Sequence, residues 1–205
     1  MTRLPRPTTI TMQFSDKEFF DYEVEHGRTP ENPDYLALHA ATADLIAKYK
    51  PRRVLEIGPG AGTVIECLAQ KGIYAAGIDS NPFHRDYFIR RNPLLADRYG
   101  LLDHKFDLQS FDFVVSIEVF EHLTDAIIHE YMRPLKPRYF LFSSTPHKST
   151  PEFDEQWGHI TLKQEPEWIR LFSEYGYALK RKLPLPTEWA LLFHKPRGLL
   201  QRFFW

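Results

Sequence analysis

The sequence predicts one α/β domain built on a mostly parallel β-sheet with helices on both faces. Strand-like apolar runs alternate with helix-like segments between residues 53 and 175, and this order is typical of parallel strands joined by crossover helices. The chain then ends in two strand-like runs separated by four residues. Four residues are too few for a crossover helix, so these runs are expected to pair as an antiparallel hairpin at one edge.

Each element follows from a local pattern. Asp34 is expected to cap a helix over residues 34–50, which Pro51 ends. Short apolar runs predict strands, and apolar residues at helical spacing predict helices. A third strand is expected at residues 94–96, just before Asp97. The other predicted strands cover residues 53–57, 74–78, 113–117, 139–143, 177–183 and 188–194, and the other helices cover 63–71, 82–91, 125–132 and 166–175.

Composition agrees with a single domain over residues 1–205. With 43% hydrophobic and 26% charged residues, the chain is long enough for one good core and short for two. We divide it into an N-terminal leader or lid (1–33), a Rossmann-like core (34–196) and a basic, aromatic tail (197–205). The leader is polar, but it carries four aromatic residues that can dock it: Phe14, Phe19, Phe20 and Tyr22.

Charge and patterning argue against several classes of protein. The formal net charge of -1 provides no overall basic field for nucleic acid. Cys67 is the only cysteine, so a disulfide within the chain is excluded. No apolar run reaches the ~20 residues needed to span a bilayer, and residues 1–7 lack the apolar core of a secretory signal. A cytoplasmic protein without a membrane partner is therefore expected.

A glycine-rich turn after the first predicted strand is the strongest functional signal. Gly58, Gly60 and Gly62 follow residues 54–57 and precede a helical pattern. Glycine is needed where the backbone turns sharply and approaches a ligand, because a Cβ would clash there. Asp79 ends the next strand, one βαβ step after Glu56, and an acid at that place can accept both hydroxyls of a ribose. The pattern predicts a site for a nucleoside cofactor.

The spacing of the glycines indicates which cofactor. The chain reads G-x-G-x-G, whereas a dinucleotide fingerprint starting at Gly58 would need a small residue at Thr63. Glu56, two residues before the first glycine, would repel a diphosphate but suits an ammonium group. S-adenosyl-L-methionine carries an ammonium group and a sulfonium, and it has no phosphate. The loop therefore favours this cofactor.

These residues resemble the first motif of the class I S-adenosylmethionine-dependent methyltransferases, with a type 11/23-like domain. Residues 111–123 resemble the fourth strand of that family and the helix after it, and residues 135–146 resemble its fifth strand and exit loop. The resemblance covers residues 51–176 and implies a seven-stranded Rossmann-like sheet. It implies cofactor contacts from Glu56, Gly58, Pro59, Gly60, Gly62, Asp79, Ser80, Asn81 and Glu118. For the acid that receives the adenine amino group we choose Asp97, with Asp103 and Asp107 as competitors.

The acceptor side of the site is expected after the fourth strand. Glu118, Glu121 and His122 have the spacing i, i+3, i+4, which puts them on one face if the segment is the first turn of a helix. Acids at a helix N-terminus are also expected on electrostatic grounds alone. The element resembles the Glu-x-x-Glu-His of metal-dependent O-methyltransferases of the ubiquinone-pathway type and of small-RNA 2′-O-methyltransferases. That resemblance implies Mg²⁺ or Mn²⁺ held by Glu118, Glu121 and His122, with His159 as a fourth ligand.

The catalytic residues we predict are His159, His122 and Glu118. Methyl transfer from a sulfonium needs alignment of the acceptor and a group that takes its proton. His159 is our first choice of base, and His147 lies on the same loop. The alternative is that Trp157 and His159 only pack under the following helix.

Three functions stay open at this point. The first is a methyltransferase that acts on an oxygen or nitrogen of a small-molecule acceptor. The second is a metal-dependent RNA 2′-O-methyltransferase. The third is a non-catalytic partner subunit that binds S-adenosylmethionine. The complete glycine loop and the ribose acid favour an enzyme, and the lack of a basic stripe places RNA behind a small molecule.

Overall fold

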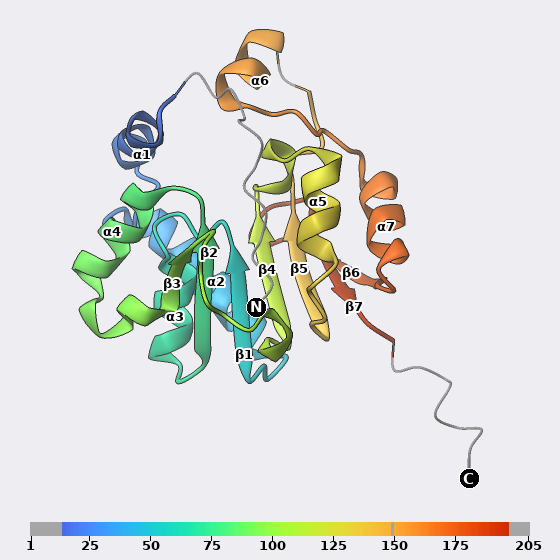
Figure 1. Cartoon of the computed structure of the whole chain (residues 1–205), viewed down its shortest axis with the longest axis horizontal. Coiled ribbons are helices and arrows are strands. Elements are labelled where there is room, and N and C mark those ends of the chain that lie inside the picture. Colours follow the sequence, from blue (N-terminus) through green and yellow to red (C-terminus); the bar gives the residue numbers. More distant parts are fainter. Residues whose placement is uncertain (1–13, 149, 197–205) are drawn as a thin grey trace.

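The computed structural model describes residues 14–148 and 150–196. Its centre is a seven-stranded sheet in the order β3-β2-β1-β4-β5-β7-β6 (Figure 1). Strands β1 to β5 run parallel, whereas β7 is antiparallel to both β5 and β6. The strands are β1 (Arg53–Ile57), β2 (Tyr74–Asp79), β3 (Tyr99–Leu101), β4 (Phe113–Ile117), β5 (Tyr139–Ser143), β6 (Ala178–Leu183) and β7 (Ala190–His194).

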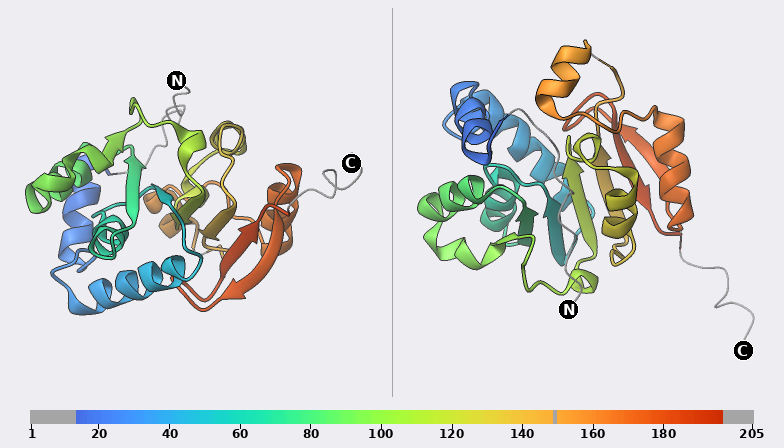
Figure 2. Two further views of the ribbon diagram at one scale, coloured as in Figure 1. Left: turned by 90° about the horizontal axis from the view of Figure 1, so that it is seen from below. Right: turned by 45° about the horizontal axis from the view of Figure 1, so that its top comes forward.

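Helices cover both faces of the sheet (Figure 2). One face packs against α2 (Pro33–Ala47), α3 (Thr63–Gln70) and α4 (Pro82–Arg91), and the other against α5 (Asp125–Met132) and α7 (Glu165–Glu174). Leu95 packs on the first of these faces, and Leu108 and Phe120 pack on the second. These residues belong to three short 3₁₀ helices: η1 (Pro93–Arg98), η2 (Leu108–Ser110) and η3 (Phe120–His122). The sequence-based prediction of an α/β sheet covered on both sides is confirmed.

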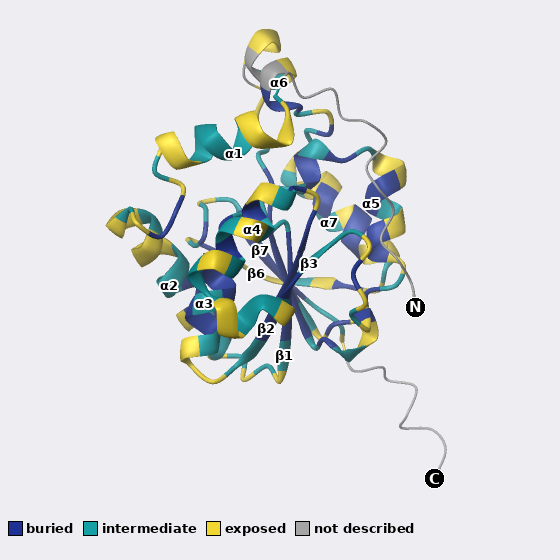
Figure 3. Ribbon diagram, turned by 60° about the vertical axis from the view of Figure 1, so that its left-hand side comes forward, coloured by how far each residue is buried: buried dark blue, intermediate teal, exposed yellow. Residues whose placement is uncertain are grey.

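The central strands are buried on both faces, which explains why they are largely apolar. Side chains alternate between the faces along a strand, so Val54 joins the core under α2 and α3, whereas Leu55 joins the core under α5 and α7. Figure 3 shows these strands as the most deeply buried part of the chain. This packing holds the ends of the parallel strands in fixed positions.

Two further helices lie beyond the carboxyl ends of the parallel strands (Figure 1). They are α1 (Asp16–Glu25) and α6 (Pro151–Trp157). Ser15 and Glu18 form a capping box that starts α1. The ring of Trp157 meets the ring of Tyr22 at 4.4 Å and that of Phe14 at 5.6 Å between centroids. The N-terminal helix and the segment after β5 therefore meet at this edge.

The C-terminal hairpin is confirmed. Strand β7 pairs with β6 and also with β5, with Phe140 opposite Phe193. A connection this short allows β7 to run only antiparallel to β6. The apolar side chains of β7 pack against the helices on both faces of the sheet. The hairpin thus extends the sheet beyond β5.

Two local predictions are wrong. Helix α2 begins at Pro33, and its cap is Asn32, whose side chain accepts from the backbone N–H of Asp34. Pro33 suits the first helical position because its fixed φ is helical and its missing N–H is not needed there. Asp34 is therefore inside the helix and is not its cap.

The predicted strand at residues 94–96 is the second error. These residues lie in η1, and the side chain of Leu94 is 94% exposed. The third strand, β3, follows η1 and pairs Leu101 with Asp79. Asp97 therefore precedes the strand, and its carboxylate pairs with Arg98 at 3.5 Å. An acid before the strand lies at the wrong end to meet an adenine at the carboxyl edge.

Across the part of the chain that is described, no helix is long and apolar enough to cross a membrane. The predicted tail (197–205) and the first 13 residues of the leader lie outside the described residues. The proposed division into leader, core and tail stays a prediction.

Candidate cofactor and acceptor site

The strand order places the site. Strands β1 and β4 are neighbours, and the chain leaves them toward opposite edges of the sheet. In open α/β sheets, ligands bind in the crevice at the carboxyl ends of the strands at such a switch point. The glycine loop follows β1, Asp79 ends β2, and Glu118 follows β4. The three predicted motifs therefore meet at one crevice.

The three glycines of the loop have different roles. All three have a positive φ, from 52° at Gly60 to 74° at Gly62. A Cβ at Gly58 would lie 2.4 Å from Val119, and one at Gly62 would lie 2.3 Å from Phe88. These two glycines allow close packing within the protein. A Cβ at Gly60 would meet no atom within 4 Å, so Gly60 is the glycine that leaves open space for a ligand.

Glu56 is a buried acid beside this loop. Its side chain is 4% exposed, and Oε2 has no hydrogen-bond partner. Burial, together with the negative charge of Asp79, raises the pKa of Glu56. An unpaired buried carboxyl group is costly, and a ligand ammonium group would offset that cost. Glu56 therefore fits the amino group of a methionine moiety.

Asp79 is held by several donors from the protein. Oδ1 accepts from the N–H of Asn81 at 2.8 Å, and Oδ2 accepts from the N–H of Gly60 at 3.1 Å and from the hydroxyl of Tyr99 at 3.2 Å. Burial acts to raise the pKa of Asp79, but these bonds and the nearby His84 outweigh it and lower the pKa. Asp79 is thus a fixed, ionised acceptor at the end of β2.

The other predicted cofactor residues are placed around Asp79. Asn81 caps α4, since its side chain accepts from the N–H of Phe83. Ser80 is exposed, and Pro59 is buried. Asp103 is the first acid after β3, at the same edge as Asp79, and it is exposed. Asp107 instead caps η2 by accepting from the N–H of Gln109.

Glu118 does not share a face with Glu121 and His122, and the prediction of a helical turn here is wrong. Glu118 has a left-handed φ of 52°, and only residues 120–122 form the short helix η3. Its carboxylate accepts from the hydroxyl of Thr145 at 2.5 Å and from the indole N–H of Trp189 at 2.9 Å. Glu118 is therefore directed toward the β5 exit loop and β7.

Glu121, His122 and His159 form a cluster. Each offers one ligand atom, and these atoms lie within 4.8 Å of one another. Glu121 is buried and accepts from the hydroxyl of Ser144 at 2.9 Å. Burial, and then the charge of Glu118, raises the pKa of Glu121. Burial, and then the nearby His159, lowers the pKa of His122 to about 4, so its imidazole is neutral near pH 7.

His159 borders a cavity. Its Nδ1 lies 3.1 Å from Oδ1 of Asp154, which orients the ring. The cavity has a volume of about 440 Å³ and is lined by Lys148, Pro151, Asp154, His159, Ile160 and Leu162. A second cavity of about 310 Å³ lies between β5, α7 and β7, and it includes His147, Trp168 and Trp189. Both cavities border the acceptor side predicted from the sequence.

Several residues of the site escaped the sequence analysis. Tyr99 bonds Asp79, Trp189 bonds Glu118, and His84 lies between Asp79 and helix α1. None of these three residues belongs to the same sequence motif as the residue that it contacts. Of these three, His84 had a signal in the sequence. It is a histidine in the first turn of α4, the helix that follows Asp79, which we expect to bind the ribose.

Comparison with known proteins agrees with this geometry. A family model described as "Methyltransferase domain" matches residues 28–181. The chain is 27% identical over 184 residues to a ubiquinone biosynthesis O-methyltransferase of Neisseria meningitidis, covering 83% of this chain and 70% of the relative. It is 27% identical over 197 residues to the protein of the same name from Pasteurella multocida, covering 88% and 72%.

Solved structures share the fold. A magnesium protoporphyrin IX methyltransferase from Synechocystis PCC 6803, with bound SAH, superposes with a TM-score of 0.59 at 16% identity, over 78% of this chain and 84% of that one. Mitomycin 7-O-methyltransferase superposes with a TM-score of 0.60 at 15% identity, over 90% and 61%. The family match, together with the crevice at β1, β2 and β4, identifies the chain as a member of the S-adenosylmethionine-dependent methyltransferases.

Proposed function

We propose that the protein transfers the methyl group of S-adenosylmethionine to an oxygen of a small-molecule acceptor, with nitrogen as the alternative acceptor atom. The observation that carries the proposal is the cluster of Glu121, His122 and His159 at the same edge as the cofactor crevice. These groups can orient an acceptor hydroxyl and take its proton. The curated relatives are named for O-methyl transfer in ubiquinone biosynthesis, which supports oxygen.

Each part of S-adenosylmethionine would meet a suitable residue in the cofactor crevice. Glu56 would accept the ammonium group, Gly60 would leave space for the methionine chain, and Asp79 would accept the ribose hydroxyls. Asp103 replaces Asp97 as our candidate for the adenine amino group, because it follows β3 at the edge where Asp79 lies.

Asp79→Asn is expected to weaken the binding of S-adenosylhomocysteine. Each charge-assisted hydrogen bond to the ribose contributes about 1.5–3 kcal/mol, so the affinity should fall about 10- to 100-fold. Isothermal calorimetry measures this. Asp97→Asn is the control, since Asp97 is exposed and lies before β3. Equal losses in the two variants would contradict the assignment of Asp79.

On the acceptor side, His159 is the proposed base. When Nδ1 donates to Asp154, Nε2 carries the lone pair that can receive a proton. Glu118 is held by Thr145 and Trp189, so we assign it to the wall between the cofactor and the acceptor. His122, buried and neutral, would orient the acceptor or a metal ion.

The cluster also fits a divalent ion. Nδ1 of His122 is buried without a hydrogen-bond partner, and a carboxylate with two imidazoles suits Mn²⁺ and similar ions better than Mg²⁺. We propose Glu121, His122 and His159 as its ligands, without Glu118. Because Nδ1 of His159 faces Asp154, the ion would bind Nε2, so His159 would serve as the base only in the absence of an ion. When bound, the ion would supply positive charge that lowers the pKa of an acceptor hydroxyl.

Removal of metal is expected to lower the activity strongly, and Mn²⁺ is expected to restore it. Calorimetry should show one Mn²⁺ bound per chain, lost in Glu121→Gln and His122→Gln. His194→Gln is the control, because His194 lies at the opposite edge of the sheet. Activity that survives exhaustive chelation would mean that the cluster acts without a metal.

The proposed function is tested by incubating the protein with methyl-labelled S-adenosylmethionine, Mn²⁺ and two acceptor pools, one of small metabolites and one of RNA. We expect label in the small-molecule pool. Label in RNA alone would make the protein an RNA 2′-O-methyltransferase. No label under any metal condition would favour a non-catalytic subunit.

A further inference from the structure

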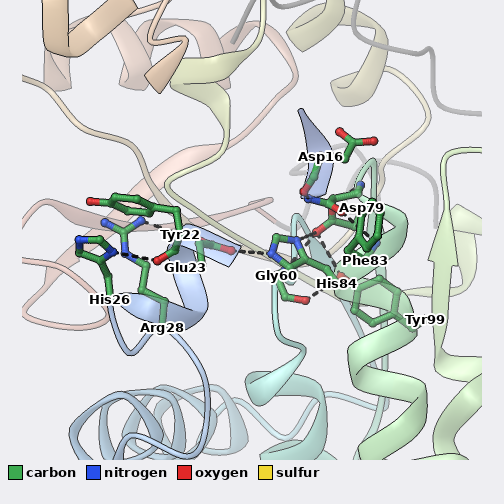
Figure 4. A network of polar contacts seen from close by, with 11 residues as sticks. Asp16, Tyr22, Glu23, His26, Arg28, Gly60, Asp79, Phe83, His84 and Tyr99 are labelled. Atoms are coloured by element: carbon green, nitrogen blue, oxygen red, sulfur yellow. Dashed lines mark hydrogen bonds and ion pairs between the residues drawn. The ribbon is translucent and has the colours of Figure 1, made fainter. Parts of the chain in front are cut away.

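Helix α1 reaches the cofactor crevice through a chain of alternating charges (Figure 4). Nη1 of Arg28 lies 3.9 Å from Oε1 of Glu23, and Oε2 of Glu23 lies 2.5 Å from Nε2 of His84. On its other side, Nδ1 of His84 lies 3.8 Å from Oδ2 of Asp79. The chain joins the N-terminal segment to the acid that we place on the ribose.

His84 is the central member of the chain. Its side chain is 5% exposed and lies between two carboxylates. Burial alone would lower its pKa, but the contacts with Asp79 and Glu23 outweigh burial and raise the pKa to about 10. A buried cation is stable only when it is paired. The imidazolium is therefore paired closely with Glu23 from α1, and it faces Asp79 from β2 at 3.8 Å, a distance too long for a hydrogen bond.

The rest of α1 is lightly attached. None of its residues is buried. Asn81 donates a hydrogen bond from its side chain to the carbonyl of Asp16 at 2.7 Å, and the rings of Phe19 and Phe20 meet the ring of His84 edge-on. Further ring contacts join Phe20 to Tyr87 and join Phe19 and Tyr22 to Trp157. Segments with few buried contacts open at low free-energy cost. Among the ion pairs of the described residues, the pair of His84 with Glu23 is the one that joins α1 to α4.

We propose that His84 is a positioning residue that couples the docking of α1 to cofactor binding. It orients the Asp79 carboxylate from behind while it holds α1 over the crevice through Glu23. Coupling is reciprocal, so a bound ribose that fixes Asp79 also stabilises the docked helix. This inference rests on the proposed placement of the ribose on Asp79.

The test is the affinity for S-adenosylhomocysteine, measured by calorimetry on the full chain. Glu23→Gln and His84→Gln are each expected to weaken binding about 5- to 20-fold, within the usual range of such coupling. Glu25→Gln, an exposed acid at the end of the same helix, should leave it unchanged. The side chain of Glu23 is 17% exposed, against 5% for His84, so the Glu23 variant is expected to fold even if His84→Gln does not.

Two further measurements separate coupling from a general structural effect. Glu23→Gln introduced into His84→Gln should cause no additional loss, because both act through one chain. An S-adenosylhomocysteine analogue without the ribose hydroxyls should bind Glu23→Gln and wild-type protein equally. Amide exchange in residues 16–25 should slow when S-adenosylhomocysteine is added to the wild-type protein and should slow less in Glu23→Gln.

Failure of the proposed function and failure of the coupling would give different results. If the wild-type protein does not bind S-adenosylhomocysteine, the proposed function fails, and this inference fails with it. If the wild-type protein binds it and Glu23→Gln binds as tightly as Glu25→Gln, the coupling alone is overturned. An additive loss in the double variant, or an equal loss with the hydroxyl-free analogue, would also overturn it.

Discussion

Gly60→Val should remove detectable binding of S-adenosylhomocysteine, a loss of about 100-fold or more, corresponding to at least about 2.7 kcal/mol. A Cβ at Gly60 meets no protein atom within 4 Å, so the valine side chain would occupy the open space of the crevice. The loop would still close through the tight packing at Gly58 and Gly62. The loss should therefore come from blocked ligand space.

A matched control comes from Gly72. It also has a positive φ, 73° against 52° at Gly60, and a Cβ there also meets no atom within 4 Å. It lies in the turn between α3 and β2, away from the crevice. Both valine variants should lose similar stability from backbone strain, about 1–2 kcal/mol. If Gly60→Val binds the ligand as well as Gly72→Val does, the glycine loop does not face the cofactor.

His159→Ala should lower kcat about 10²- to 10⁴-fold, the usual contribution of a positioned base, while the affinity for S-adenosylhomocysteine stays within a few fold. The reason is location: His159 follows α6 and borders the cavity on the acceptor side, whereas the cofactor residues follow β1 and β2. Single-turnover kinetics with labelled cofactor would separate the chemical step from binding.

The alternatives predict different results. His147 borders the second cavity, so a larger effect of His147→Ala than of His159→Ala would move the base to that side. Asp154→Ala should lower kcat by a smaller factor than His159→Ala, because it removes only the partner of Nδ1. A cofactor affinity that falls as far as the rate would mean that His159 helps to hold the cofactor.

The sequence predicted those features whose local pattern is compatible with a single structure. The predicted connection, residues 184–187, has four residues and cannot contain a crossover helix. The antiparallel pairing of β6 and β7 could therefore be predicted. The runs at 53–57 and 113–117 are largely apolar, interrupted by Arg53, Glu56 and Ser116, because both faces of those strands are covered. The glycine spacing indicated the cofactor because positive φ and close packing tolerate few other residues.

The third strand escaped prediction because the local pattern and the tertiary structure disagree. Leu94 and Leu95 form an apolar run, yet Leu94 is exposed on a 3₁₀ helix. Strand β3 has three residues, and its position is set by pairing with β2. The choice of Asp97 for the adenine contact depended on this predicted strand. The signal for Asn32 as a cap was present, since Pro33 follows it.

The sequence did not indicate which residues pair over long range in the site. Glu23 and His84 are far apart in the chain, and neither stands in a recognisable motif. The left-handed backbone of Glu118 breaks the helical spacing that placed it beside Glu121 and His122. Such contacts depend on how α1, β4 and β7 meet, which only the assembled fold determines.

The proposed function requires S-adenosylmethionine to occupy the crevice at β1, β2 and β4. The most direct test is a calorimetric comparison of S-adenosylhomocysteine with NAD on the same wild-type protein. We expect one S-adenosylhomocysteine bound per chain and no measurable binding of NAD at the same concentrations, because Thr63 stands where a dinucleotide-binding loop starting at Gly58 would need a small residue. Tighter binding of NAD, or no binding of S-adenosylhomocysteine, would contradict it.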